Sequence, residues 1–374
     1  MKIILVGING WYIYHFWMPL LRLLREKKYN ITIILENDAF TENLEGLGFN
    51  IRIVNFNSQS INPIKNLISL ISILRIYISI KPDIVHHLNP KPVIFGTIAA
   101  KITQTNCIVN NYPGLGNLFR KDRIKFRLLF FITSLLYKFI NSKKNIYSVF
   151  QVKEDLNFFI QKKLIGKSYP ILIQSSGVDL NEFKIRKNFN MKGTLNVGMI
   201  SRLNYDKGID IFFNIARKLE KKNFSFTLVG QLDSKFEFKK FRDECLKNNI
   251  KYLGFSSNIV SILNELDVII LPTRRLEGIP KILIEAAATG TTLISSNLGG
   301  CKEIVLNEKN GYIVDLKDIA NQIIKKLNII NKNRNLLVSY GNNGRAVVEK
   351  NFDIDIVINK YSNLFDELEK KYGQ

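Results

Sequence analysis

The chain has 374 residues, enough for two domains that each bury a core. Hydrophobic residues make up 46% and charged residues 23%, a composition that excludes disordered, collagen-like and coiled-coil proteins. Lys and Arg number 54 against 32 Asp and Glu, and residues 1–190 hold 26 of the basic and 11 of the acidic side chains, so this half would attract nucleic acid, anionic lipid or phosphorylated substrates.

The cysteines exclude a disulfide framework and fit a reducing compartment, because there are only three and they lie far apart: Cys107, Cys245 and Cys301. The apolar stretch at the N-terminus is interrupted by polar residues and Pro19, so we interpret it as mature protein and not as a signal peptide. The longest apolar runs are shorter than the ~20 residues that span a bilayer, so no transmembrane segment is expected.

Short apolar runs alternate with helical segments along the first half of the chain. Strands are predicted at 1–6, 31–35, 51–54, 83–87 and 107–110, and helices at 17–25, 64–80 and 93–102. This alternation favours a parallel sheet covered by helices.

A polar stretch without periodicity, 184–193, is predicted to link the two domains, 1–183 and 194–352. After it the alternation resumes, with strands expected at 194–200, 224–229, 252–254, 268–271 and 291–295. The fold class is therefore α/β, with two doubly wound domains expected to face each other across a cleft. Ligands of such sheets bind beyond the carboxyl ends of the strands.

Two glutamates follow the strand predicted at 268–271. Glu277 lies in a loop with Gly278, and Pro280 suits the first turn of the helix that carries Glu285. Because Glu285 stands between Ile-Leu-Ile and three alanines, its carboxylate is expected to be buried with a dedicated partner. The alternative is a Glu285 that points to solvent from the polar face of an amphipathic helix.

Two cations follow the first strand of the second domain. Arg202 and Lys207 flank a loop that opens a helix at Gly208, so positive charge and backbone N–H groups converge there. This arrangement predicts a diphosphate site that needs no metal ion. Two cations in a loop can also be plain solvated surface, but their place at the carboxyl end of a strand favours the binding site.

A series of short motifs, taken in their order along the chain, is more specific than any one of them. It comprises Gly177-Val178-Asp179 with Phe183, Arg202 with Lys207-Gly208, Leu228-Val229-Gly230, Asp267 before an apolar run, Glu277-Gly278 with Glu285, and Gly299-Gly300 before Glu303. The series resembles glycosyltransferase family 4, retaining sugar-nucleotide enzymes of GT-B fold whose signature also separates two glutamates by seven residues. The resemblance covers nearly the whole chain and is sharpest from 177 to 311.

The resemblance implies roles for the second domain. Arg202 and Lys207 would bind the donor diphosphate, Glu277 would contact the donor sugar beside Gly278 and Ile279, and Glu285 would contact the nucleotide ribose. It also implies front-face transfer, with Glu277, Arg202 and Lys207 as the catalytic residues and with no metal cofactor. A final helical segment, 353–374, is similar to the family's C-terminal element that crosses back to the first domain. Its Asp353-Ile354-Asp355 is interpreted as a helix N-cap and not as a metal-binding pair.

The acceptor would lie against the first domain. Its glycine turn (Gly7, Asn9 and Gly10) and the later segment Asn111-Tyr112-Pro113-Gly114 are similar to the bacterial branch that builds undecaprenyl-diphosphate-linked glycans. We expect acceptor contacts from Gly10, His15, His87 and Gly114. His86 and His87 end one strand, and alternation predicts that one faces the core and the other the cleft. Either could instead only cap the strand, and the aromatic cluster around His15 could be core packing.

A cationic and apolar segment, 120–144, suits a helix that lies in a membrane interface. A core helix with a solvated start is the alternative. We prefer the membrane-interface helix, and we therefore expect a protein on the inner face of the cytoplasmic membrane that contacts the anionic membrane surface.

The predicted activity is transfer of a hexose or N-acetylhexosamine from a nucleotide-sugar donor, expected to be a UDP-sugar, to a lipid-diphosphate-linked saccharide in capsule, O-antigen or protein-glycan synthesis. A sugar-nucleotide 2-epimerase of the same architecture is one alternative. A basic nucleic-acid-binding protein is another, although no nucleic-acid-binding module is recognisable, so no nucleic-acid partner is expected.

Overall fold

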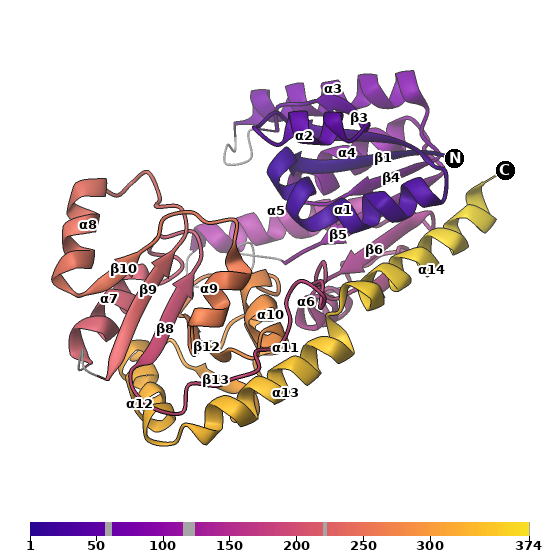
Figure 1. Cartoon of the computed structure of the whole chain (residues 1–374). Helices are drawn as coiled ribbons and strands as arrows, with labels where there is room; N and C mark the ends of the chain where they lie inside the picture. The colour runs from indigo at the N-terminus through magenta and orange to yellow at the C-terminus, as the bar shows by residue number, and fades with distance from the viewer. Residues whose placement is uncertain (57–61, 115–123, 220–222, 374) are drawn as a thin grey trace. The chain divides into compact units, whose positions relative to one another are not determined.

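The computed structural model describes residues 1–56, 62–114, 124–219 and 223–373, and their contacts divide the chain into two compact units (Figure 1). The first unit comprises Met1–Ser176 and Asp355–Gln374, and the second comprises Gly177–Ile354. Each unit is built on one parallel sheet with helices on both faces, so the prediction of two doubly wound α/β domains is confirmed.

The sheet of the first unit has, over the described residues, seven strands in the order β3-β2-β1-β4-β5-β6-β7. These are β1 (Lys2–Asn9), β2 (Asn30–Glu36), β3 (Asn50–Ile53), β4 (Ile84–His87), β5 (Cys107–Tyr112), β6 (Ile146–Phe150) and β7 (Tyr169–Leu172). The order reverses between β1 and β4, and this is the topological switch point at which parallel sheets bind ligands.

Helices of the first unit cover the two faces of its sheet with separate cores. They are α1 (Gly10–Glu26), α2 (Thr41–Gly46), α3 (Pro63–Ile80), α4 (Pro90–Ile102), α5 (Ile124–Ile140), α6 (Lys153–Gln161) and α14 (Ile354–Tyr372). On one face α1 and α14 share a core that includes Trp17 and Tyr361. On the other face α3 and α4 share a core that includes Tyr77 and Ala99.

The sheet of the second unit has six described strands in the order β10-β9-β8-β11-β12-β13. They are β8 (Leu195–Ile200), β9 (Phe224–Val229), β10 (Ile250–Tyr252), β11 (Val268–Leu271), β12 (Thr292–Ser296) and β13 (Gly311–Val314). The helices are α7 (Ile209–Lys218), α8 (Phe238–Lys247), α9 (Ile259–Glu265), α10 (Lys281–Ala288), α11 (Cys301–Ile304), α12 (Ile319–Lys332) and α13 (Asn335–Asn351). Here the switch point lies between the neighbouring strands β8 and β11.

The division between the units lies at Ser176 and Gly177, earlier than the predicted linker 184–193. That stretch packs into the second unit, because Arg186 donates hydrogen bonds to the carbonyl oxygens of Leu263, Leu266 and Thr289. Arg186 and Asn190 thus bond within the second unit while the lysines of the stretch are exposed, so its polar composition did not mark the boundary. At the other end α14 packs into the first unit, so the predicted return of the C-terminal segment is confirmed.

One described helix, α3, is long and apolar enough to span a membrane by length and composition, although the apolar runs in the sequence predicted none. In this fold it is part of a layer: Ser69, Ile73 and Tyr77 are buried against the sheet and α4. Tyr77 also hydrogen-bonds to His87. Because one side of α3 packs against the sheet and α4, lipid does not surround this helix on all sides.

Candidate active site

The switch point of the second unit brings together a lysine, a glutamate and a threonine. Lys207 lies in the loop after β8, and Glu277 lies in the loop after the neighbouring strand β11. Lys207 Nζ forms an ion pair with Glu277 Oε2, and Thr273 Oγ1 donates a hydrogen bond of 2.6 Å to Glu277 Oε1. Both carboxylate oxygens of Glu277 are therefore held, so its orientation is set before any ligand arrives.

Further contacts tie the loop after β8 to the loop after β11. Arg274 forms a two-pronged ion pair with Asp210, with N–O distances of 2.6 and 2.7 Å, and this contact raises the pKa of Arg274. The Arg274 N–H bonds to the carbonyl oxygen of Asp206 at 2.8 Å. Gly208 has a φ of +85°, and a Cβ there would lie 2.3 Å from the Pro272 carbonyl oxygen, so only glycine fits. These contacts hold the loop after β11 against the loop after β8 and the start of α7.

Gly299 and Gly300, in the loop after β12, pack closely against the backbone of the glutamate loop. A Cβ on Gly300 would lie 2.4 Å from the Gly278 carbonyl carbon and from the Ile279 nitrogen. The Gly300 N–H also donates to the Glu277 carbonyl oxygen at 3.0 Å. This loop leads into α10, whose first turn receives no side-chain cap from any described residue. The partial positive charge of that helix end favours a nearby anion.

Glu285 lies on α10 and is 9% exposed, so the prediction of a buried carboxylate is confirmed and the solvent-facing alternative is wrong. Its ionic contact is Lys281, one turn earlier, with an N–O distance of 3.8 Å. Burial raises the pKa of Glu285, Lys281 lowers it and Glu182 raises it. A carboxylate buried with so distant a counter-ion is costly, which is typical of a binding group.

Arg202 lies two residues after β8 and is exposed, and its guanidinium forms no hydrogen bond or ion pair with the described residues. The structure therefore brings Lys207 and Glu277 together but leaves Arg202 extended from the same loop. Thr273 and Arg274 were missed by the sequence analysis, as was Asn204, whose Oδ1 accepts the Lys207 N–H at 3.0 Å. Their position in the chain could have indicated them, since each lies within a few residues of the carboxyl end of β8 or β11.

The predicted glycine turn in the first unit is not a turn, because β1 continues to Asn9 and α1 begins at Gly10. Asn9 caps the helix through the N–H of Tyr12, and Asp38 accepts the N–H of Trp11 at 2.8 Å. A Cβ on Gly10 would lie 2.4 Å from the Asp38 carboxylate and 3.0 Å from the Thr41 backbone nitrogen, so a larger residue would have to displace Asp38. The protein's own carboxylate thus occupies this helix end.

His15 lies on α1 among aromatic rings and is partly exposed, with ring centroids 5.0 Å from Trp11 and 4.9 Å from Phe40. Gly114 follows β5 and borders the segment 115–123, which lies outside the described residues. Both positions therefore stay predictions for acceptor contact.

The prediction that only one of His86 and His87 faces the core is wrong, because both are fully buried. His87 Nε2 hydrogen-bonds to the Tyr77 hydroxyl at 2.8 Å, and Nδ1 to Asn110 Oδ1 at 2.7 Å. Burial lowers the pKa of His87 to about 4. With both ring nitrogens engaged inside the core, His87 has none to offer an acceptor, which argues against that predicted role.

His86 packs among aromatic rings, including those of Trp17, Tyr361 and Phe365. Neither ring nitrogen has a hydrogen-bond partner among the described residues, and burial lowers its pKa to about 3. Full burial arises because helices cover both faces of the central strand β4, so alternation along it does not separate core from surface.

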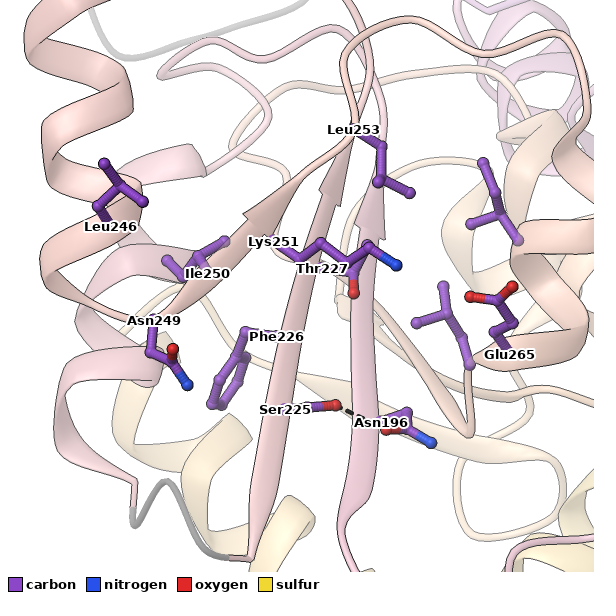
Figure 2. Close-up of a pocket in the computed structure, with 12 residues that line it drawn as sticks. Asn196, Ser225, Phe226, Thr227, Leu246, Asn249, Ile250, Lys251, Leu253 and Glu265 are labelled. Carbon is purple, nitrogen blue, oxygen red and sulfur yellow. Dashed lines mark hydrogen bonds between the residues drawn. The ribbon is translucent and has the colours of Figure 1, made fainter.

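A pocket of about 580 Å³ lies on the sheet of the second unit, beside β8, β9 and β10 (Figure 2). Its lining includes Asn196 and Ser225, joined by a 2.6 Å hydrogen bond, and reaches Glu265 at the end of α9. These residues lie along the strands or near their amino ends, and none is a predicted site residue. We place the chemistry at the charged loop cluster and not at this pocket, because the cluster lies beyond the carboxyl ends of β8 and β11, where parallel sheets bind ligands.

Two family models match the chain: glycosyl transferases group 1 over residues 181–347, and glycosyl transferase 4-like over residues 2–149. The chain is 30% identical over 333 residues to the Escherichia coli UDP-Gal:α-D-GlcNAc-diphosphoundecaprenol α-1,3-galactosyltransferase, covering 81% of this chain and 83% of that one. The chain belongs to the group 1 glycosyltransferases. The present chain is also 28% identical to the Campylobacter jejuni N,N'-diacetylbacillosaminyl-diphospho-undecaprenol α-1,3-N-acetylgalactosaminyltransferase, over 99% of this chain and all of the other.

Solved structures confirm the fold of the transferase. Anabaena HepE, determined in complex with UDP and glucose, superposes with a TM-score of 0.78 at 16% identity, over 98% of this chain and all of that one. A glycosyltransferase from Rickettsia africae gives a TM-score of 0.75 at 20% identity, over 99% of this chain and 98% of that one. The relatives are transferases, so the epimerase and nucleic-acid alternatives are not supported.

Proposed function

We propose that this transferase moves a hexose or N-acetylhexosamine from a UDP-sugar to a saccharide carried on undecaprenyl diphosphate, at the inner face of the cytoplasmic membrane. The observation that carries the proposal is the Lys207–Glu277 pair at the switch point of the second unit. The full-length similarity to the Campylobacter jejuni transferase, whose name gives a lipid-diphosphate acceptor, supports the choice of acceptor.

The cluster suits the departure of a nucleoside diphosphate. An ammonium group has three N–H donors, and Lys207 uses one side-chain contact on Glu277, so donors remain for diphosphate oxygens. Arg202 adds a second cation from the same loop, and the uncapped first turn of α10 adds partial positive charge. These groups are in place before reaction, which is the arrangement that stabilises charge as it develops.

The glutamates would orient the donor. Glu277 keeps lone pairs for sugar hydroxyls beside Gly278 and Ile279, and Glu285 would accept from the ribose. In the proposed front-face reaction the bond between the anomeric carbon and the diphosphate oxygen breaks, and the acceptor hydroxyl bonds to that carbon on the same face. The hydroxyl proton passes to the departing diphosphate oxygen, so configuration is retained without a divalent ion.

The first test is thermal stabilisation of the purified protein by UDP, other nucleotides and a panel of UDP-sugars, all with EDTA present. A ligand at 100 times its Kd stabilises by about 2.7 kcal/mol, which raises the melting temperature measurably. We expect a shift with UDP and one UDP-sugar that is lost in Lys207→Ala. No shift with any nucleotide would contradict the donor site, and a shift that EDTA abolishes would contradict metal independence.

The second test is transfer onto a synthetic undecaprenyl-diphosphate-linked N-acetylhexosamine, with the anomeric configuration of the product read by NMR. A product with the donor's configuration is expected. Inversion would contradict the front-face reaction. Transfer to the free saccharide at the same rate would contradict the lipid-linked acceptor.

A further inference from the structure

The outer surface of α3 presents large aliphatic side chains to solvent. Ile64 is 69% exposed, Leu67 55% and Ile68 58%, and the stripe continues through Ile71 and Ile78. These positions recur at the spacing of one helix face, which in a soluble protein is normally the polar face. The helix is therefore apolar on both sides, and the described residues cover only its inner side.

Neighbouring helices extend this surface. α4 contacts both α3 and α5, so we treat the three neighbouring helices as one layer. On the described part of α5, Phe131, Leu135 and Phe139 are each more than half exposed and lie one turn apart. Ile102, at the end of α4, is 59% exposed. An exposed apolar surface that runs across adjacent helices is typical of an interaction site.

The charges on this layer are almost all positive. Lys65 and Arg75 lie on the exposed side of α3, and Lys138 lies on that of α5. From 62 to 145, Asp83 is the one carboxylate among the described residues, and it accepts the N–H of Lys2. Apolar side chains set among cations complement an anionic headgroup layer over hydrocarbon.

We propose that the α3–α4–α5 layer docks on an anionic lipid bilayer, with α3 lying along the surface and Ile64, Leu67 and Ile68 inserted between headgroups. The proposal deepens the proposed function, on which it rests, because an undecaprenyl-linked acceptor is reached only at the membrane. It also changes the expected anchor, since the segment predicted from the sequence, 120–144, contributes α5, and residues 120–123 lie outside the described residues.

Two other arrangements fit the layer less well. A spanning α3 would have to expose Ser69 and Tyr77 to lipid and give up their hydrogen bonds to Asn55 and His87. A symmetric pair of chains joined through α3 would bring like charges together from both copies, since Lys65 and Arg75 lie on the same stripe. The bilayer removes both difficulties, because lipid phosphates pair with the cations.

The test is flotation of the full-length protein with vesicles of phosphatidylcholine alone, and with vesicles in which about a third of the lipid is phosphatidylglycerol. We expect binding to the anionic vesicles that weakens as salt is added. The decisive variant is Leu67→Glu, with Leu246→Glu as its matched control, because Leu246 is an exposed leucine on α8 of the second unit. Leu67→Glu should lower vesicle binding about tenfold or more, and Leu246→Glu should leave it unchanged.

The outcomes separate the alternatives. Equal vesicle binding by wild type and Leu67→Glu would overturn the proposal, as would a wild-type dimer that Leu67→Glu converts to monomers in size-exclusion chromatography. Both variants should melt like wild type, because the side chains they change are exposed. Leu67→Glu should keep its rate on a detergent-solubilised acceptor with a short prenyl chain. Loss of transfer by every form of the protein would count against the proposed function while leaving the vesicle result intact.

Discussion

Thr273→Val tests whether the orientation of Glu277 matters for transfer. Thr273 is fully buried, and its hydroxyl donates to Glu277 Oε1 at 2.6 Å while accepting the N–H of Arg275 at 3.2 Å. Valine keeps the shape and removes the hydroxyl. Glu277 then keeps only the Lys207 contact on its other oxygen, so the carboxylate can turn about that contact.

The expected size follows from the bond that is lost. A hydrogen bond to a charged group contributes about 1.5–3 kcal/mol, which corresponds to a loss of roughly 10-fold to 150-fold in kcat/KM if the bond orients a group used in the transition state. The Kd for UDP should change less than about threefold, because the hydroxyl contacts the glutamate and not the cations. Thr273 would thus be a positioning residue that acts through Glu277.

The assay compares kcat/KM for transfer with the Kd for UDP in wild type, Thr273→Val and Thr289→Val. Thr289 is the matched control, since it is equally buried in the same unit but its hydroxyl bonds to the Ala286 carbonyl and the Thr291 hydroxyl. Unchanged kcat/KM in Thr273→Val would refute the reasoning. An equal loss in Thr289→Val would show that the effect comes from general destabilisation.

Three further predictions concern charge. Lys207→Ala should lower kcat at least about 100-fold with the melting temperature nearly unchanged, because preorganised donors to developing charge contribute this much; a wild-type rate would remove Lys207 from the site. Because burial raises the pKa of Glu285, the folded state holds its proton more tightly, and stability is lost as pH rises from about 4.5 through the raised pKa. Glu285→Gln should therefore melt higher than wild type at neutral pH but not below pH about 4.5, while transfer falls about 10-fold to 100-fold; a lower melting temperature at neutral pH would contradict this. The lowered pKa of His86, about 3, means that stability is lost as pH falls below 6.5, by about 2 kcal/mol at pH 5. His86→Phe, in its aromatic surroundings, should remove that part of the pH dependence of unfolding, and a melting curve as steep in pH as wild type would contradict it.

The sequence predicted the elements whose pattern is local. The strands at 224–229 and 268–271 were predicted with the bounds that the structure shows. β11 is fully buried and reads as an unbroken apolar run, whereas β9 is only partly buried at Ser225 and Thr227. β7 was missed, since it lies at the sheet edge, is half exposed and contains Pro170. Alternation of strands and helices was sufficient for the fold class, and the ordered motifs were sufficient for the family.

The tertiary structure decided which groups meet. Lys207 and Glu277 are 70 positions apart, and they pair because β8 and β11 are neighbours at the switch point, an adjacency that no local pattern contains. Thr273 is part of the site because the loop after β11 brings its hydroxyl group to the carboxylate of Glu277. His87 is buried and does not offer a contact to the acceptor as predicted, because helices cover both faces of β4.

The helix α3 illustrates which properties the sequence determines and which only tertiary packing decides. Its sequence by itself determined that 64–80 is helical and apolar, and that the surrounding charge is positive. Because the segment is apolar on both sides, its pattern could not decide which side is buried. Packing of Ile73 and Tyr77 against the sheet settled that choice, and it left Ile64, Leu67 and Ile68 facing outward.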